Sequence, residues 1–236
     1  MRNDGTHIQS NIQTETIVNR IQRIYLRIRT EFYTFWNKRR FYKVGKNFKS
    51  SGPIHVVNGK CITIGDNVFL GDHCQLYAYP SGKIKIGNNS SVDRYVEIRG
   101  GENIIIKDSV RIVKGATIKA PDTATIIVGN RTLISQGCIF DGDIRIGDDV
   151  IFGPNVFINE VDHGFSKMDI PMNQQEGASG TIVIEDDVWI GYSVAVLKGT
   201  HIAKGSIIGA QAVVNKDVSP YSINVGVPSR IKSYRN

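Results

Sequence analysis

The sequence lacks any long apolar run, and this absence limits the class of protein first. No stretch of about 18 uninterrupted apolar residues occurs among the 236 residues, so the sequence predicts no transmembrane helix. The first residues also lack the apolar segment of a secretory signal. We therefore expect a cytoplasmic protein.

Cysteine is also scarce. The three cysteines, Cys61, Cys74 and Cys138, are odd in number and lack the spacing of metal ligands. We expect them to be small, reduced residues of the protein wall, and we expect no metal site.

An excess of positive over negative charge is absent outside the first fifty residues. Residues 1–50 hold 11 Lys or Arg and 3 Asp or Glu, a net charge of +8, whereas residues 51–236 hold 18 and 19, a net charge of −1. The main part of the chain therefore has no electrostatic footprint for nucleic acid, and we expect no nucleic-acid partner.

Apolar residues recur every six positions through most of the chain. A period of six fits neither an amphipathic helix nor a half-buried strand, but it fits a short strand and a turn in each repeat. It predicts a mainly β protein, a parallel hexapeptide-repeat β-helix of about seven coils with roughly 18 residues per coil. Gly follows many of these residues, and we expect it to permit the backbone conformation of the corners. The series is Ile64, Leu70, Leu76, Ile86, Val92, Ile98, Ile106, Ile112, Ile118, Val128, Ile134, Phe140, Ile146, Phe152, Ile158, Ile184, Ile190, Val196, Ile202, Ile208 and Val214.

The N-terminal segment has a different pattern. Residues 11–42 are predicted to form one helix or two helices with a bend, because Ile17, Ile21, Ile24 and Ile28 form one apolar stripe flanked by arginines. Either the stripe caps the β-helix or packs on another subunit, or it contacts an anionic membrane surface peripherally. We divide the chain into a helical segment (1–50), a β-helix domain (51–218) and a C-terminal tail (219–236).

One interruption of the repeat marks a candidate functional loop. The spacing from Ile158 to Ile184 is 26 residues, so about 20 residues, 159–180, leave the wall. A loop of this length in a compact repeat domain is usually functional. It contains His163, and imidazole is the commonest side chain for removing a hydroxyl proton.

His163 would need an orienting partner, which Asp162, Glu160 or a backbone carbonyl could supply. Its rival as a general base is His201 in the late coils. Trp189 lies next to the repeat residue Ile190, so it is expected to point outward from the wall.

Five stretches of the C-terminal half carry a resemblance to a known family. They resemble the hexapeptide-repeat O-acetyltransferases, including galactoside and maltose acetyltransferases and those that modify bacterial capsules and O-antigens. The basic helical N-terminus is more similar to the surface-polysaccharide members. The stretches are Asp162-His-Gly-Phe165, Ile184-Glu-Asp-Asp-Val-Trp-Ile-Gly191, Gly199-Thr-His-Ile202, Val213-Val-Asn-Lys-Asp-Val218 and Gly226-Val-Pro-Ser-Arg230.

The resemblance implies an acetyl-CoA-dependent transferase that acetylates a sugar hydroxyl, with His163 as its general base. It implies a left-handed β-helix, a homotrimer, and active sites between neighbouring subunits, with a cytoplasmic location or one at the inner membrane surface. Many polysaccharide members have a second His two residues earlier in this loop, where this sequence has Val161. The expected acceptor-binding residues are Trp189, Ser135 and Asp141, and the expected cofactor-binding residues are Tyr192, Ala210, Asn215, Lys216 and Arg230.

Other functions remain as alternatives. The same base could serve N-acetyl transfer to an amino sugar. A γ-type carbonic anhydrase would need three converging histidines, and only His163 and His201 lie near the later coils. A non-catalytic trimeric scaffold would not bind acetyl-CoA.

Overall fold

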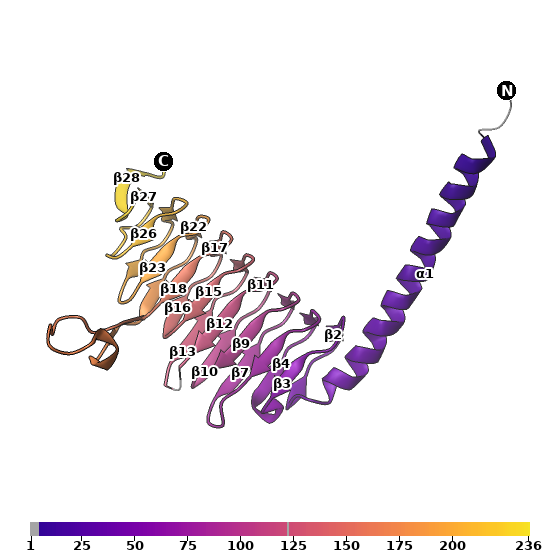
Figure 1. Ribbon diagram of the computed structural model, residues 1–236, viewed down its shortest axis with the longest axis horizontal. Coiled ribbons are helices and arrows are strands. Elements are labelled where there is room, and N and C mark those ends of the chain that lie inside the picture. The colour runs from indigo at the N-terminus through magenta and orange to yellow at the C-terminus, as the bar shows by residue number, and fades with distance from the viewer. Residues whose placement is uncertain (1–4, 122) are drawn as a thin grey trace.

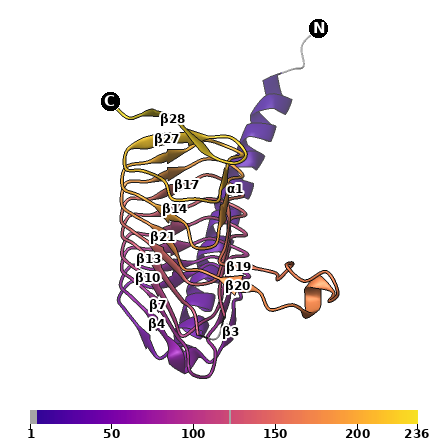
Figure 2. The same cartoon turned by 90° about the vertical axis from the view of Figure 1, so that its left-hand side faces the viewer.

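The molecule is one long helix followed by a parallel β-solenoid with three faces (Figure 1). This computed structural model describes residues 5–121 and 123–236, with side chains described from Val18 onward. Helix α1 (Gly5–Lys38) extends away from the solenoid, and a loop projects from the solenoid wall (Figure 2). The predicted fold class is confirmed, and its left hand stays an expectation from the resemblance. Among the described helices, none combines the length and apolarity needed to cross a membrane.

Successive strands of the solenoid go to three different sheets, here called sheets A, B and C. Sheet A consists of β1 (Lys43–Val44), β4 (Ile62–Ile64), β7 (Lys83–Ile86), β10 (Asn103–Ile106), β13 (Thr125–Val128), β16 (Ile144–Ile146), β21 (Ile182–Ile184) and β24 (His201–Ile202). Sheet B consists of β2 (Lys49–Ser50), β5 (Phe69–Leu70), β8 (Ser91–Val92), β11 (Arg111–Ile112), β14 (Leu133–Ile134), β17 (Ile151–Phe152), β22 (Trp189–Ile190), β25 (Ile207–Ile208), β27 (Ser222–Val225) and β28 (Arg230–Tyr234). Sheet C consists of β3 (His55–Val57), β6 (Gln75–Tyr77), β9 (Glu97–Gly100), β12 (Thr117–Ala120), β15 (Ile139–Asp141), β18 (Phe157–Asn159), β23 (Ala195–Leu197) and β26 (Val213–Val214).

The solenoid is longer at both ends than the sequence predicted. Sheets A and C have eight strands each, whereas about seven coils were predicted. The additional coil, β1–β2–β3, begins at residue 43, so strand pairing reaches into the segment 1–50 that was assigned to the helix. At the other end, β27 pairs in parallel with β25 and β28 folds back on β27, so residues 222–234 continue sheet B instead of forming a separate tail.

The six-residue repeat forms the core. Ile106, Ile112 and Ile118 point inward from three successive strands of one coil and are fully buried. Parallel pairing stacks equivalent residues of successive coils, so that Ile86 lies against Ile106 and Ile106 against Val128. Burying each such side chain contributes about 1.5–3 kcal/mol relative to leaving it exposed, and this gain repeats in every coil.

The corner between sheets A and B is held by a ladder of side-chain oxygens. A carboxylate or amide oxygen accepts the backbone N–H at the same position of the preceding coil, as Asp186 Oδ1 does from Asp148 N at 2.7 Å and Asp148 Oδ1 from Asn130 N at 2.8 Å. The other acceptors in this ladder are Asp66, Asn88, Asp108 and Asn130. Each of the first six coils is therefore fixed to the next by a polar contact outside the β-sheet pairing.

The glycines that follow the repeat residues are required for a different reason than the sequence suggested. At Gly147 the backbone is not left-handed, but a Cβ there would lie 2.4 Å from Asp186 Oδ1 and 2.7 Å from Asp186 N. The left-handed backbone occurs two residues later, for example at Asp149 and Asp187. Gly is needed at these positions because the next coil passes too close for a side chain.

Helix α1 is continuous, and its last turns meet the solenoid (Figure 1). Asn37, which is 3% exposed, donates to Ser50 Oγ and to the Gly52 carbonyl, both at 3.0 Å. The Thr34 hydroxyl accepts the Ser50 N–H at 2.9 Å, and Arg29 pairs with Asp72 at 3.2 Å. The helix therefore caps the first coil with polar side chains, and its apolar stripe stays exposed. Ile17, the first residue of the predicted stripe, lies outside the described side chains.

Candidate active site

The predicted loop is an ordered hairpin that leaves the corner between sheets C and A. After β18, strand β19 (Val161–Asp162) pairs with β20 (Ala178–Ser179) in antiparallel fashion. Beyond this neck, the head of the loop contains the short 3-10 helix η2 (Met172–Gln174). The side chain of Gln175 fixes the head by bonding the backbone N–H and carbonyl of Lys167 and the carbonyl of Ile170.

His163 lies where the neck of the hairpin meets the head. Its imidazole is exposed and, in the described part of the chain, forms no hydrogen bond. Neither of its two predicted carboxylate partners is hydrogen-bonded to it. Asp162 pairs with Lys198 at 3.6 Å, and the buried Glu160 accepts the Asp143 N–H at 2.6 Å.

Two of the expected cofactor-binding residues lie on a different edge, the corner between sheets B and C. Tyr192 and Ala210 are equivalent residues of successive coils, and the carbonyl of Tyr192 accepts the Gln211 N–H at 2.8 Å. One coil earlier, the carbonyl of Pro154 accepts the Ser193 N–H at 2.9 Å. These corners therefore form a continuous column along the solenoid, which we call the B–C column. Hydrogen bonds from Ser193, and next from Asn155, lower the pKa of Tyr192.

The remaining cofactor-binding candidates are divided between two further places. Asn215 and Lys216 follow β26 at the C–A corner, on the same edge as the hairpin, and both are exposed. Arg230 opens β28 in sheet B, where its Nη1 donates to the Ser229 carbonyl at 2.8 Å. A single chain does not gather the five predicted residues into one groove.

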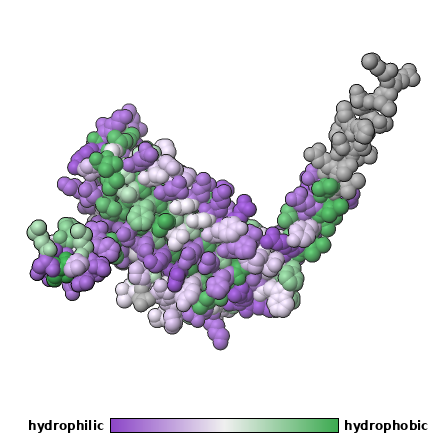
Figure 3. Space-filling view, viewed as in Figure 1, coloured by the Kyte–Doolittle hydropathy of each residue, from purple (hydrophilic) through white to green (hydrophobic). Residues whose placement is uncertain are grey.

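Trp189 lies on the outer face of sheet B and is 52% exposed, while its neighbours Val188 and Ile190 are buried. It is paired with Ile151 in the preceding coil, which is also exposed. On sheet C, beyond the B–C column, Ile139 and Phe157 form a second exposed apolar pair. The space-filling view shows apolar surface over these later coils (Figure 3). The B–C column is thus flanked on both sides by exposed apolar side chains.

The other two acceptor-binding candidates, Ser135 and Asp141, do not lie next to each other. Ser135 is half-buried at the B–C corner just after β14. Asp141 lies at the far end of β15, where its Oδ2 accepts from Lys119 Nζ at 2.9 Å. Sheet C separates these two residues, as it separates the B–C column from His163.

Comparison with known proteins agrees with the repeat architecture. A family model described as bacterial transferase hexapeptide (six repeats) matches residues 181–216. Residues 181–216 therefore match the hexapeptide repeat of that family. The predicted resemblance to hexapeptide-repeat acetyltransferases is confirmed by the named relatives that it matches.

Three curated relatives match this chain over most of its length. The probable acetyltransferase Rv3034c of Mycobacterium tuberculosis is 29% identical over 86% of this chain, which spans only 59% of that relative. The putative lipopolysaccharide biosynthesis O-acetyl transferase WbbJ of Escherichia coli K12 is 26% identical over 78% of both chains. An Escherichia coli dTDP-4-amino-4,6-dideoxy-D-glucose acyltransferase is 28% identical over 74% of this chain and 82% of that protein.

Among solved structures, the polysialic acid O-acetyltransferase OatWY superposes with a TM-score of 0.57 at 21% identity. The match covers 81% of this chain and 87% of the other. At this identity the similarity concerns the fold.

The structure adds two residues that were not predicted from the sequence. Lys198 ties the base of the hairpin to the next coil through Asp162, and Gln175 holds the head of the loop together. Lys198 could have been found by register, because Leu197 pairs with Asn159 and the next residue must then face the base of the loop. Gln175 had no signal in the sequence, because loop contacts have no period.

Proposed function

We propose that this protein is an acetyl-CoA-dependent O-acetyltransferase acting on a sugar hydroxyl, with His163 as its general base. The observation that carries the proposal is the position of His163. It is held at the neck of an ordered hairpin, and within the described chain no other side chain is hydrogen-bonded to its imidazole. The relatives named as sugar transferases support the same reaction class, and the resemblance to WbbJ supports a role in surface polysaccharide biosynthesis. A cytoplasmic location is part of the same proposal.

The chemistry follows from what an exposed imidazole can do. One nitrogen of His163 would accept the proton of the acceptor hydroxyl while that oxygen forms a bond to the acetyl carbon. The carbon–sulfur bond of the thioester then breaks, and the departing sulfur takes the proton back from the imidazolium. Acetyl-CoA supplies the activated acetyl group, and this chain supplies the base.

The residues present fit acetyl-CoA, which is an elongated and anionic co-substrate. The B–C column offers a continuous run of corners, in which Ala210 is exposed and Ser193 beside Tyr192 is small and half-buried. Lys216 and Arg230 are exposed cations suited to phosphate, Lys as a mobile charge and Arg as a planar fork. Near Arg230 the buried Ser229 Oγ has no hydrogen-bond partner within the described residues.

The division of these residues between two edges of sheet C supports an active site shared between copies. A base on the C–A edge and a co-substrate column on the B–C edge meet only if the hairpin of one copy reaches the column of another. The exposed apolar pairs on both sides of the column fit such a contact. A closed ring of this kind would be the homotrimer expected from the family resemblance.

Thiol release from acetyl-CoA with a panel of oligosaccharides tests the reaction and the base together. Loss of a general base typically lowers the rate about 10²–10⁴-fold, so His163→Ala should lose this much while still binding acetyl-CoA. His201→Ala is the matched control, because His201 is also exposed but bonds Glu185 at 2.8 Å on the wall of sheet A. Equal activity of His163→Ala and wild type would refute the assignment of the base, and absent acetyl-CoA binding would refute the enzyme.

A mixing experiment tests the shared site separately. His163→Ala removes the base, and Ala210→Trp obstructs the B–C column while leaving His163 intact. Copies of the two inactive variants assembled at equal ratio should recover about a quarter of wild-type turnover, because that share of sites combines one intact base with one intact column. No recovery in mixed assemblies would place the site within one chain.

The amino-sugar relative makes N-acyl transfer the specific alternative. The same imidazole could remove a proton from an ammonium group. Product analysis by NMR distinguishes the two, since an ester and an amide of the same sugar differ in the shift of the acylated carbon. Turnover restricted to amino sugars would replace the hydroxyl acceptor in the proposal.

A further inference from the structure

The N-terminal helix has an apolar stripe that the rest of the chain leaves uncovered. Ile21, Ile24 and Ile28 lie along one side of α1, and Ile28 is 64% exposed. Phe32 and Phe35 continue the stripe toward the solenoid and are likewise exposed. Figure 3 shows this apolar surface on the described part of the helix.

The stripe faces away from the solenoid because a polar face holds the helix in place. Arg29, Thr34 and Asn37 make the contacts with the first coil. At 3.6 residues per turn, the centre of the apolar stripe lies roughly 170° around the helix from the centre of these contacts. The described side chains of the stripe do not pack on the end of the solenoid, so of the first expectation from the sequence only packing on another subunit stays a prediction.

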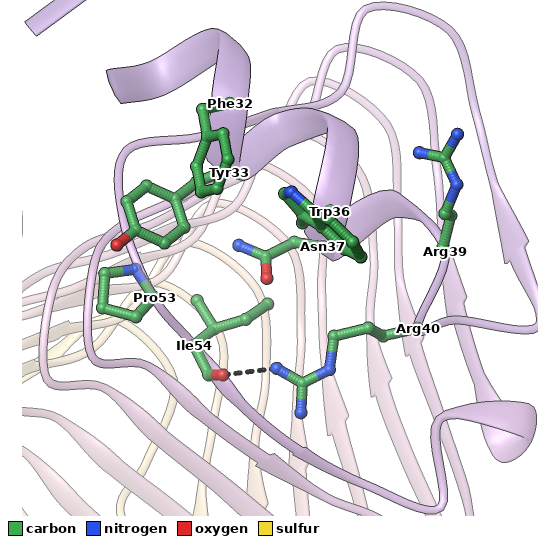
Figure 4. Close-up of a pocket in the computed structure, with 8 residues that line it drawn as sticks. All are labelled: Phe32, Tyr33, Trp36, Asn37, Arg39, Arg40, Pro53 and Ile54. Carbon is green, nitrogen blue, oxygen red and sulfur yellow. Dashed lines mark hydrogen bonds between the residues drawn. The ribbon is translucent and has the colours of Figure 1, made fainter. Parts of the chain in front are cut away.

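The stripe runs into a pocket of about 540 Å³ at the junction of helix and solenoid (Figure 4). Its walls include the rings of Phe32 and Trp36, with Pro53 of the first coil opposite them. Arg40 turns inward and donates to the Ile54 carbonyl at 2.6 Å. Arg39 points away from the rings of the pocket (Figure 4) and lies over the ring of Phe35 at 3.5 Å. Aromatic rings and arginines thus gather at one end of the stripe.

We propose that this stripe, together with the cations beside it, docks the protein on an anionic lipid surface, with the helix lying in the plane of the headgroups. Residues 18–42 hold seven Lys or Arg against the single acid Glu31, a net charge of +6. Arginine beside an apolar stripe with aromatic residues is the pattern of helices that lie in a membrane interface. An anionic headgroup layer supplies the opposite charge that these cations lack on their own helix.

A second copy of the helix is a poorer occupant of the same stripe. A heptad seam does run through the stripe, because Val18, Ile21, Tyr25, Ile28, Phe32 and Phe35 follow one another at spacings of three and four residues and include no charged side chain. Charge decides between the two occupants: each copy has a net charge of +6 on residues 18–42, so a second copy adds like charge where an anionic lipid surface neutralises it. The lipid surface is therefore the better electrostatic match for the stripe.

Vesicle flotation of the full-length protein tests the proposal. One set of vesicles is phosphatidylcholine alone, and the other contains about one-third phosphatidylglycerol. We expect binding to the anionic vesicles only, weakened by salt, and a loss of at least about tenfold in partitioning for Ile28→Asp. Gln22→Asp is the matched control, because it adds the same charge at another exposed position of the helix but outside the stripe, and it should lose much less.

Three results would overturn the proposal. Wild-type protein that fails to float with anionic vesicles excludes a lipid surface. Equal losses for Ile28→Asp and Gln22→Asp would show that charge alone, without the stripe, carries binding. A fall in the oligomeric mass of Ile28→Asp measured without vesicles, with flotation unchanged, would show that a second copy covers the stripe.

Discussion

Replacing Gly147 by Ala should destabilise the solenoid through a collision between coils. The new Cβ would lie 2.4 Å from Asp186 Oδ1, 2.7 Å from Asp186 N and 2.8 Å from Glu185 C. These atoms cannot easily retreat, because Gly147 N donates to the Ile184 carbonyl at 2.7 Å and Asp148 N to Asp186 Oδ1 at 2.7 Å. Overpacking costs about 1–3 kcal/mol, and loss of the second hydrogen bond adds about 1 kcal/mol.

The expected loss is therefore about 2–4 kcal/mol, or roughly 5–15 °C in the unfolding midpoint for a chain of this size. Far-UV circular dichroism during heating measures it. Gly115 provides the control, because its φ is +69° and a Cβ there would meet nothing within 4 Å. Gly115→Ala should cost only the left-handed strain of about 1–2 kcal/mol. Gly115→Asn should cost less, because Asn155 adopts a left-handed φ of 57° at the same corner two coils later.

Two outcomes would refute this reasoning. If Gly147→Ala melts at the same temperature as Gly115→Ala, contact between coils is not what requires glycine at the first position. If Gly115→Asn is as unstable as Gly147→Ala, backbone conformation is not what limits the second position.

Two further predictions concern titratable groups. Hydrogen bonding, first from the Asn130 side chain, holds the pKa of Asp148 below its ordinary value. The contribution of Asp148 to the free energy of unfolding is therefore complete above about pH 4 and is lost as pH falls through the lower folded-state pKa. Screening by solvent limits this contribution to about 0.5 kcal/mol. Asp148→Asn should therefore show a shallower decline in melting temperature from pH 5 to pH 2 than wild type, and parallel declines would contradict this. Burial raises the pKa of Cys74 to about 12 and of Cys138 to about 11, whereas Cys61 is only half-buried. A thiol reagent should therefore label Cys61 in the native protein and all three cysteines after unfolding, and rapid labelling of Cys74 in the native state would show that its coil opens.

The sequence predicted the repeating coils well because their period is carried by single, fully buried residues. It missed the first coil because the inward residue of β2 is Ser50, which interrupts the apolar series between Val44 and Val56. That serine is buried and is satisfied by Asn37 of the helix. A polar pair between two distant elements replaces the apolar residue, and no periodicity in either element reveals it.

The candidate site was predictable in parts. The length of the interruption predicted a loop carrying His163, and alternation predicted that Trp189 points outward. The corner of the solenoid on which each residue lies was not predicted, although it follows from counting strands. His163 comes after a strand of sheet C, and Tyr192 comes after a strand of sheet B. The pairing of Asp162 with Lys198 was not predictable from spacing within the loop, because it joins the loop to the next coil.

The solenoid fixes where an acceptor must be presented if the helix lies on lipid. The hairpin leaves the sixth coil, β16–β17–β18, whereas the helix caps the first coil, β1–β2–β3. Five intervals between neighbouring strands, each about 4.8 Å, place the base of the hairpin about 25 Å along the solenoid from the capped end. A sugar attached directly to a lipid head would not reach that far, but a chain of several sugars would. We therefore expect longer lipid-linked oligosaccharides to be better acceptors than short ones on anionic vesicles. This preference should disappear for Ile28→Asp. The same variant should acetylate free oligosaccharides as well as wild type does.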